Sequence, residues 1–200
     1  MQTAPTKNTS RTYLRMAFIP LAVGINLGIS ALVQILKLPV FLDSIGTIIT
    51  ALLFGWRSGA IVGVLSFAIS SVTVFPPAIY FSGTQICIAI YVQIVGGFGG
   101  FKNVFRTFVS GIGLAIVAAL VSAPVIYFLF GGITGNGISI FTLYLQAHGF
   151  SKGASVITSG ITAEMIDKVA QCLITLFILK SIPASLLKNF YSDRLKKNNL

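Results

Sequence analysis

The chain is built from long apolar runs separated by short gaps that hold nearly all of its charged residues. A bilayer core of about 30 Å needs roughly 20 apolar residues per helix, and fewer where a helix packs against neighbours. Breakers such as Pro39, Gly55, Pro76 and Gly96 end successive runs. The pattern predicts an all-α membrane protein, a six-transmembrane-helix bundle with spans at about 14–36, 41–54, 59–74, 79–95, 107–130 and 156–179.

Composition supports a membrane protein and argues against a nucleic-acid partner. Only 9% of the residues are charged, whereas soluble domains carry about 25%, so lipid must solvate the apolar excess. The net charge is +10, but nucleic-acid-binding proteins concentrate such charge in a patch on a folded domain. Here the basic residues lie at the termini and in short gaps, where anionic lipid headgroups are the expected partners.

The same basic residues predict the orientation, because Lys and Arg are enriched in cytoplasmic loops and tails. With the N-terminus inside, only Lys37 and Lys152 lie in outer gaps. We therefore expect both termini in the cytoplasm, with tails at 1–13 and 181–200, a membrane domain at 14–180, and an uncleaved first span. The eleven basic residues on the inner side are Lys7, Arg11, Arg15, Arg57, Lys102, Arg106, Lys180, Lys188, Arg194, Lys196 and Lys197.

The last apolar run contains three charged residues, Glu164, Asp167 and Lys168. Charges within a span usually face a bundle interior, a cavity or a partner charge. Glu164 precedes Lys168 by four residues, the favourable order for a helical ion pair. One interpretation is an ion pair that neutralises itself and holds the helix to its neighbours. The other, which we favour, is a polar ligand cavity open to the outside, because one acid is left over once Lys168 is paired.

Further polar residues fall on the predicted outer side. We expect these residues to contact a ligand, although two of them have an alternative role. Asp43 could instead be a helix N-cap, and His148 could instead be an interfacial loop residue. Because no second His and no ligand spacing accompany His148, no metal site is expected. Asn26, in the middle of the first run, is expected to bond a neighbouring helix. The predicted substrate-binding residues are Gln34, Asp43, Tyr80, Gln85, His148, Glu164, Asp167 and Lys168.

The predicted inner half is apolar, with Gln93 nearly alone among polar side chains. A channel or self-contained carrier needs a route through the membrane, so the chain is expected to bind cargo from outside without translocating it unaided. Hydrolase, metalloprotease and nucleotide-binding motifs are missing from the sequence, and neither an enzyme activity nor a cofactor is expected. The glycine-broken segment 131–155 is either a half-buried loop or a short interfacial helix.

Small residues recur at helical spacing at Gly24 and Gly28, and again at Gly55, Gly59 and Gly63. The small-xxx-small pattern permits close approach of helices in a membrane. It serves either packing within the bundle, which base rates favour, or the docking of a membrane-embedded partner.

The stretch 38–66, LPVFLDSIGTIITALLFGWRSGAIVGVLS, resembles the second and third helices of the substrate-binding S components of energy-coupling factor (ECF) vitamin importers. The resemblance implies that the chain binds a vitamin in an outer cavity of the plasma membrane of a bacterium. It further implies docking to a membrane coupling subunit driven by two cytoplasmic ATPase subunits. The family docks through an Ala-x-x-x-Ala face on its first helix, to which Gly24, Gly28 and Ala31 correspond here.

The layout also resembles the branch of that family assigned to cobalamin, and the long 131–155 segment suits a bulky cargo. Queuosine-type bases, pantothenate and other vitamins are alternatives. Two functions of other kinds also remain open. One is a membrane sensor or scaffold whose basic tails meet a cytoplasmic partner, and the other is a self-sufficient small-solute transporter.

Overall fold

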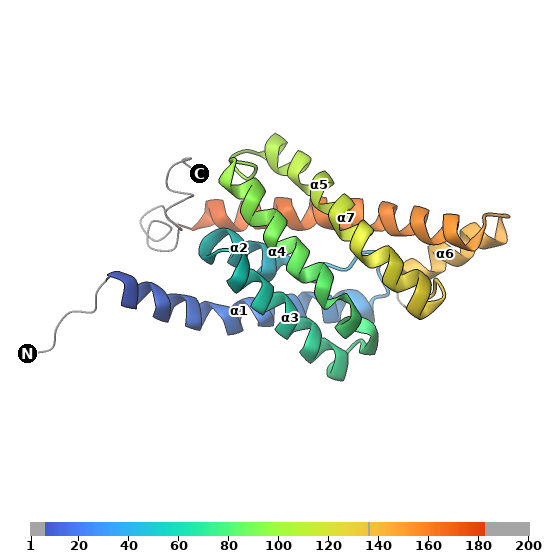
Figure 1. Ribbon diagram of the computed structural model, residues 1–200, viewed down its shortest axis with the longest axis horizontal. Helices are drawn as coiled ribbons and strands as arrows, with labels where there is room; N and C mark the ends of the chain where they lie inside the picture. The colour runs from blue at the N-terminus through green and yellow to red at the C-terminus, as the bar shows by residue number, and fades with distance from the viewer. Residues whose placement is uncertain (1–6, 136, 183–200) are drawn as a thin grey trace, which may run out of the picture.

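The computed structural model describes residues 7–135 and 137–182, and these residues form helices without any strand (Figure 1). The predicted tail residues 1–6 and 183–200 lie outside the described part, and so do the lipid contacts expected of Lys188, Arg194, Lys196 and Lys197. The helices are α1 (Lys7–Ile35), α2 (Ile45–Phe54), α3 (Trp56–Thr73), the 3-10 helix η1 (Pro76–Phe81), α4 (Ser82–Gly97), α5 (Val104–Phe130), α6 (Gly137–Ala147) and α7 (Lys152–Ser181).

Four of the described helical segments are long and apolar enough to cross a membrane. Their outward faces carry large apolar side chains: Leu120 is 70% exposed and Phe128 is 79% exposed. Contiguous apolar exposure on this scale is rare in soluble monomers. The described chain therefore fits an α-helical, membrane-embedded protein. The four segments are Thr12–Ile35, Trp56–Thr73, Pro76–Gly97 and Val104–Phe130.

Each of the six predicted apolar runs contains a helix, but some boundaries differ. α1 begins at Lys7, within the predicted tail, and α2 begins at Ile45 instead of residue 41. Residues 36–44 do not join α2 because the backbone N–H groups of Phe41 and Leu42 donate to a side chain of α7. The segment 131–155 contains the short helix α6, one of the two conformations considered for it.

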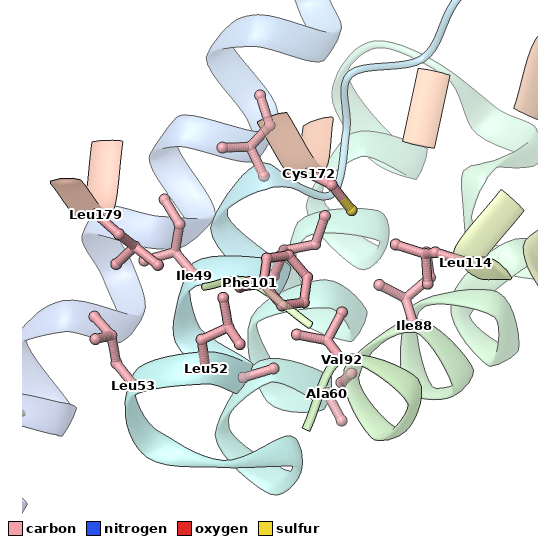
Figure 2. Packing of buried hydrophobic residues seen from close by; sticks show 14 residues of the cluster. Ile49, Leu52, Leu53, Ala60, Ile88, Val92, Phe101, Leu114, Cys172 and Leu179 are labelled. Atoms are coloured by element: carbon pink, nitrogen blue, oxygen red, sulfur yellow. The ribbon is translucent and has the colours of Figure 1, made fainter. Parts of the chain in front are cut away.

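α2 is buried on all sides, with every residue from Ile45 to Leu53 inaccessible to solvent. At ten residues and 1.5 Å per residue it is about 15 Å long, half the thickness of a bilayer core. It contacts α1, α3, α4 and α7, and an apolar helix with no polar face is stable only in such surroundings. Figure 2 shows its side chains Ile49, Leu52 and Leu53 in one cluster with Phe101, which is fully buried.

Two ends of the bundle can be distinguished. α1 begins and α7 ends at the left of Figure 1, whereas α6 lies at the right. The apolar core includes Leu53 at the end of α2, Phe101 in the α4–α5 connection and Leu179 near the end of α7. Gln93, the polar residue expected to stand nearly alone in this part, accepts a hydrogen bond from the backbone N–H of Trp56 and so caps α3. The polar site described below lies beyond this core.

Candidate ligand-binding site

Three of the four acidic residues of the chain gather around one lysine inside the bundle. Lys168 of α7 is 2% exposed, and its Nζ lies 2.6 Å from Asp167 Oδ2. The same Nζ lies 3.5 Å from Asp43 Oδ1 and 3.5 Å from Glu164 Oε2. The predicted pair of Glu164 with Lys168 is therefore present, but it belongs to a larger cluster that carries three carboxylates and one ammonium.

Asp167 is the structural member of the cluster. Its Oδ1 accepts hydrogen bonds from the backbone N–H groups of Phe41 (2.9 Å) and Leu42 (2.7 Å). Its Oδ2 accepts from Lys168 Nζ and from Gln171 Nε2, both at 2.6 Å. The carboxylate is thus surrounded by donors, as a fully buried charge must be. These bonds tie the 36–44 segment to α7.

Asp43 ends a chain of directed hydrogen bonds that crosses four elements. Asn26 Nδ2 of α1 donates to Thr47 Oγ1 (3.1 Å), which donates to Gln85 Oε1 (2.8 Å). Gln85 Nε2 donates to Ser44 Oγ (2.7 Å), which donates to Asp43 Oδ1 (2.7 Å). Every bond points its donor toward the carboxylate, and aligned bonds of this kind polarise one another. The chain therefore stabilises a negative charge on Asp43.

Glu164 is held less completely than Asp167 although it is only 5% exposed. Its Oε1 accepts one long bond from Ser122 Oγ of α5, at 3.5 Å. Its Oε2 accepts no hydrogen bond from any described residue. Lys168 Nζ reaches this oxygen only as an ion pair at 3.5 Å, so Glu164 Oε2 lacks the close donor that a buried polar atom normally has.

A cavity opens beside this cluster between the ends of α1, α3 and α5, η1 and the start of α4. Its volume is about 60 Å³, space for a few water molecules. Charged and amide groups meet aromatic rings in its wall. It is lined by Ser30, Gln34, Phe41, Asp43, Phe67, Ser70, Phe75, Ala78, Phe81, Thr84, Gln85, Ile88, Ser122, Ile126, Thr134, Glu164 and Lys168.

A second cavity of about 20 Å³ continues the first toward α6. Phe41, Ser122, Ile126, Thr134 and Glu164 border both cavities. Its far wall is formed by α6 and α7, where Thr142 and Ser159 share a hydrogen bond of 2.7 Å between their hydroxyl oxygens. Glu164 therefore lies where the two cavities meet.

Five of the eight predicted substrate-binding residues line the cavity: Gln34, Asp43, Gln85, Glu164 and Lys168. Asp167 lies behind them and holds the 36–44 segment. The structure does not bring the remaining two to the cavity wall. Tyr80 is exposed and packs edge-on against Phe130, and His148, just after α6, packs at a tilt against Tyr144, with 4.1 Å between ring centroids.

The N-cap role considered for Asp43 is wrong, because Ser44 is the N-cap of α2. Asp43 lies one residue earlier, where its side chain faces Lys168 instead of the helix end. The prediction that Asn26 bonds a neighbouring helix is confirmed by its bonds to Thr47 of α2 and Ser66 of α3.

Sequence reasoning missed several residues that build the site. Gln171 lies four residues after Asp167 and accepts from the backbone N–H of Ser44 at 3.0 Å, and this helical spacing could have identified it. No sequence pattern could have identified Thr84, Ser122 or the phenylalanines that line the cavity, since isolated Ser, Thr and Phe residues are common in apolar helices. Only the packing of α3, α4 and α5 shows that they face the same space.

The two sets of small residues separate in the structure. A Cβ built at Gly59 would lie 2.8 Å from Ala51 Cβ, and one at Gly63 would lie 2.6 Å from Gln85 Cβ, so these glycines serve packing within the bundle. A Cβ at Gly24 or Gly28 would meet nothing within 4 Å. Gly24 and Gly28 are exposed on α1 and Ala31 is half-buried there.

No family model matches the chain, and neither a curated protein nor a solved structure matches it.

Proposed function

We propose that the protein is the substrate-binding subunit of an ECF-type vitamin importer. It captures a small water-soluble cargo from outside the cell and passes it to an ATP-driven coupling module. The observation that carries this proposal is the cavity bordered by Asp43, Glu164 and Lys168 at one end of an otherwise apolar bundle. A buried charge cluster is costly in a membrane protein, and in most cases it marks a substrate or ion site.

The apolar core supports a binding subunit in preference to a self-sufficient transporter. Beyond Asp167 and Gln171, α7 continues into the fully buried Cys172 and the buried Leu179, which pack with α2 and Phe101. The described interior therefore has a buried charged cluster at one end and an apolar cluster without charged side chains at the other. A chain built this way needs a partner to release cargo on the second side.

In the proposed topology α7 and the short, enclosed α2 complete six spans, with both termini in the cytoplasm of a bacterium. The distribution of basic residues supports this arrangement. The cavity then opens outward, since it lies where α1 and α3 end and α4 begins. The face of Gly24, Gly28 and Ala31 would receive the coupling subunit, because close helix contact needs small residues and no described residue covers the two glycines.

The size of the cavity favours a compact cargo. Drug-sized ligands occupy pockets of roughly 300–1,000 Å³, whereas the main cavity has about 60 Å³. Any vitamin therefore requires its walls to move apart on binding. Cobalamin, the bulky cargo expected from the loop length, would require displacement of both the 36–44 segment and α6. We propose a smaller vitamin in its place.

Mild purification followed by mass spectrometry tests the proposal. We expect a membrane coupling subunit and two ATPase subunits to co-purify with the chain, together with a vitamin-sized molecule. In liposomes, uptake of that molecule should require all four proteins and ATP. Uptake by this chain alone would overturn the proposed function.

A further inference from the structure

We propose that the cavity recognises an organic cation, whose ammonium group binds Glu164 from the cavity side while Lys168 stays in place, and whose apolar body lies against the phenylalanines of the wall. The inference deepens the proposed function, because it rests on the cavity being the cargo site and names the chemical class of that cargo.

The charge of the cluster is the first argument. Asp43, Glu164 and Asp167 supply three carboxylates, and Lys168 supplies the one ammonium in contact with them. Lys168 is closest to Asp167, at 2.6 Å, and lies 3.5 Å from each of the others. Asp167 is already satisfied by four donors. Asp43 and Glu164, which border the cavity, therefore share one ammonium at 3.5 Å from each, and a cation that donates to Glu164 would favour the charged form of its carboxyl group.

Buried polar atoms without a hydrogen bond are the second argument. Glu164 borders the cavity, and its buried Oε2 accepts no hydrogen bond from a described residue beyond the ion pair with Lys168 at 3.5 Å. Thr84 of α4 also lines the cavity, and its Oγ1 has no hydrogen-bond partner within the described residues. A ligand that donates to Glu164 and carries one further polar atom for Thr84 would satisfy both.

The aromatic wall is the third argument. Phe41, Phe67, Phe75 and Phe81 all line the cavity. Aromatic faces attract cations within about 6 Å of the ring centroid, and Lys168 Nζ already lies 5.7 Å from the centroid of Phe41. The same rings give an apolar body a surface to pack on. Carboxylates beside phenylalanines therefore suit an organic ammonium better than a hydrated ion.

An inorganic cation fits the same residues less well. In the described part of the chain no group of three or more His, Cys, Asp or Glu side chains could hold a metal ion. The position nearest to all three carboxylates is occupied by Lys168 Nζ. A metal there would have to displace a lysine that is bound to Asp167.

Three probes of similar shape and different charge test the proposal on the full chain alone in lipid nanodiscs. They are 2-phenylethylammonium, 2-phenylethanol and 3-phenylpropionate. We expect only the ammonium probe to raise the thermal unfolding midpoint at millimolar concentration. Glu164→Gln keeps the shape of the side chain and removes its charge. This variant should lower the affinity for the ammonium probe by about tenfold or more. Thr162→Val, an exposed position on the same helix, should leave the affinity unchanged.

Equal stabilisation by the alcohol, preference for the carboxylate, or no response to any probe would overturn the proposal. Stabilisation by sodium chloride over choline chloride would point to an inorganic cation and would overturn it as well. Because the coupling module is missing from this assay, the two proposals fail separately. Charge selectivity without module-dependent uptake would refute the proposed function alone, and module-dependent uptake of a neutral or anionic cargo would refute only the cation.

Discussion

At the scale of single residues, the charged cluster divides into a structural part and a ligand-binding part. Asp167 has a donor for each of its lone-pair directions and does not border the cavity. Glu164 borders the cavity and has one oxygen without a hydrogen bond. The two acids are three residues apart on one helix, yet their surroundings give them different roles.

Replacing Asp167 should therefore destabilise the fold more than replacing Glu164. Asp167→Ala leaves Lys168, Gln171 and two backbone N–H groups without their acceptor. Removing one partner of a buried ion pair costs about 3–5 kcal/mol. Thermal unfolding in detergent should show a clear loss for Asp167→Ala and a smaller change for Glu164→Gln. Equal midpoints for the two variants would contradict this division of roles.

At the scale of helices, glycines decide how closely elements approach. Gly46 of α2 faces the backbone of α1, and an added Cβ there would lie 2.1 Å from the carbonyl oxygen of Ala22. Asn26 Oδ1 accepts from the N–H of Gly46 at 2.7 Å, so the contact also carries part of the polar network. The face of Gly24 and Gly28 on the same helix α1 meets nothing.

A pair of alanine substitutions distinguishes these two kinds of glycine. Gly46→Ala should lower the unfolding midpoint, because backbone atoms cannot rotate away from the added methyl group and overpacking costs about 1–3 kcal/mol. Gly24→Ala serves as the control and should be neutral or slightly stabilising in a helix. A midpoint unchanged by Gly46→Ala would mean that α1 and α2 are less closely packed than described.

The open face of α1 leads to a separate prediction about assembly. Gly28→Leu should leave folding and ligand binding unchanged, since no described atom lies within 4 Å of the added Cβ. It should abolish co-purification of the coupling subunit, because a bulky side chain prevents close helix contact. Loss of ligand binding with intact co-purification would assign this face to the bundle instead.

At the scale of the whole molecule, the buried charged cluster and the main apolar cluster lie in different parts of one bundle. The cavity is bordered by the end of α1 and the start of α4, whereas the core around Phe101 includes the ends of α2 and α7. Which side of the membrane the cavity faces depends on the orientation of the chain. The proposed orientation, with basic gaps inside, places the cavity outside.

Cysteine labelling tests that orientation. In a chain with Cys87 and Cys172 replaced by alanine, Lys37→Cys and Lys152→Cys should react with an impermeant maleimide added to intact cells. Arg57→Cys and Lys102→Cys should react only after permeabilisation. The reversed pattern would place the cavity toward the cytoplasm and would contradict an importer that captures cargo from outside.

The sequence by itself determined the helical membrane class, the approximate helix positions and five of the residues that line the cavity, because hydropathy and buried charge act locally and leave a pattern in the chain. Only the tertiary structure decided which polar residues meet. Asp43 and Lys168 are 125 residues apart and in contact, while Tyr80 and His148 lie away from the cavity wall. It also separated the packed Gly59 and Gly63 from the open Gly24 and Gly28. Such pairings depend on how helices pack against one another, and no local pattern of residues records that.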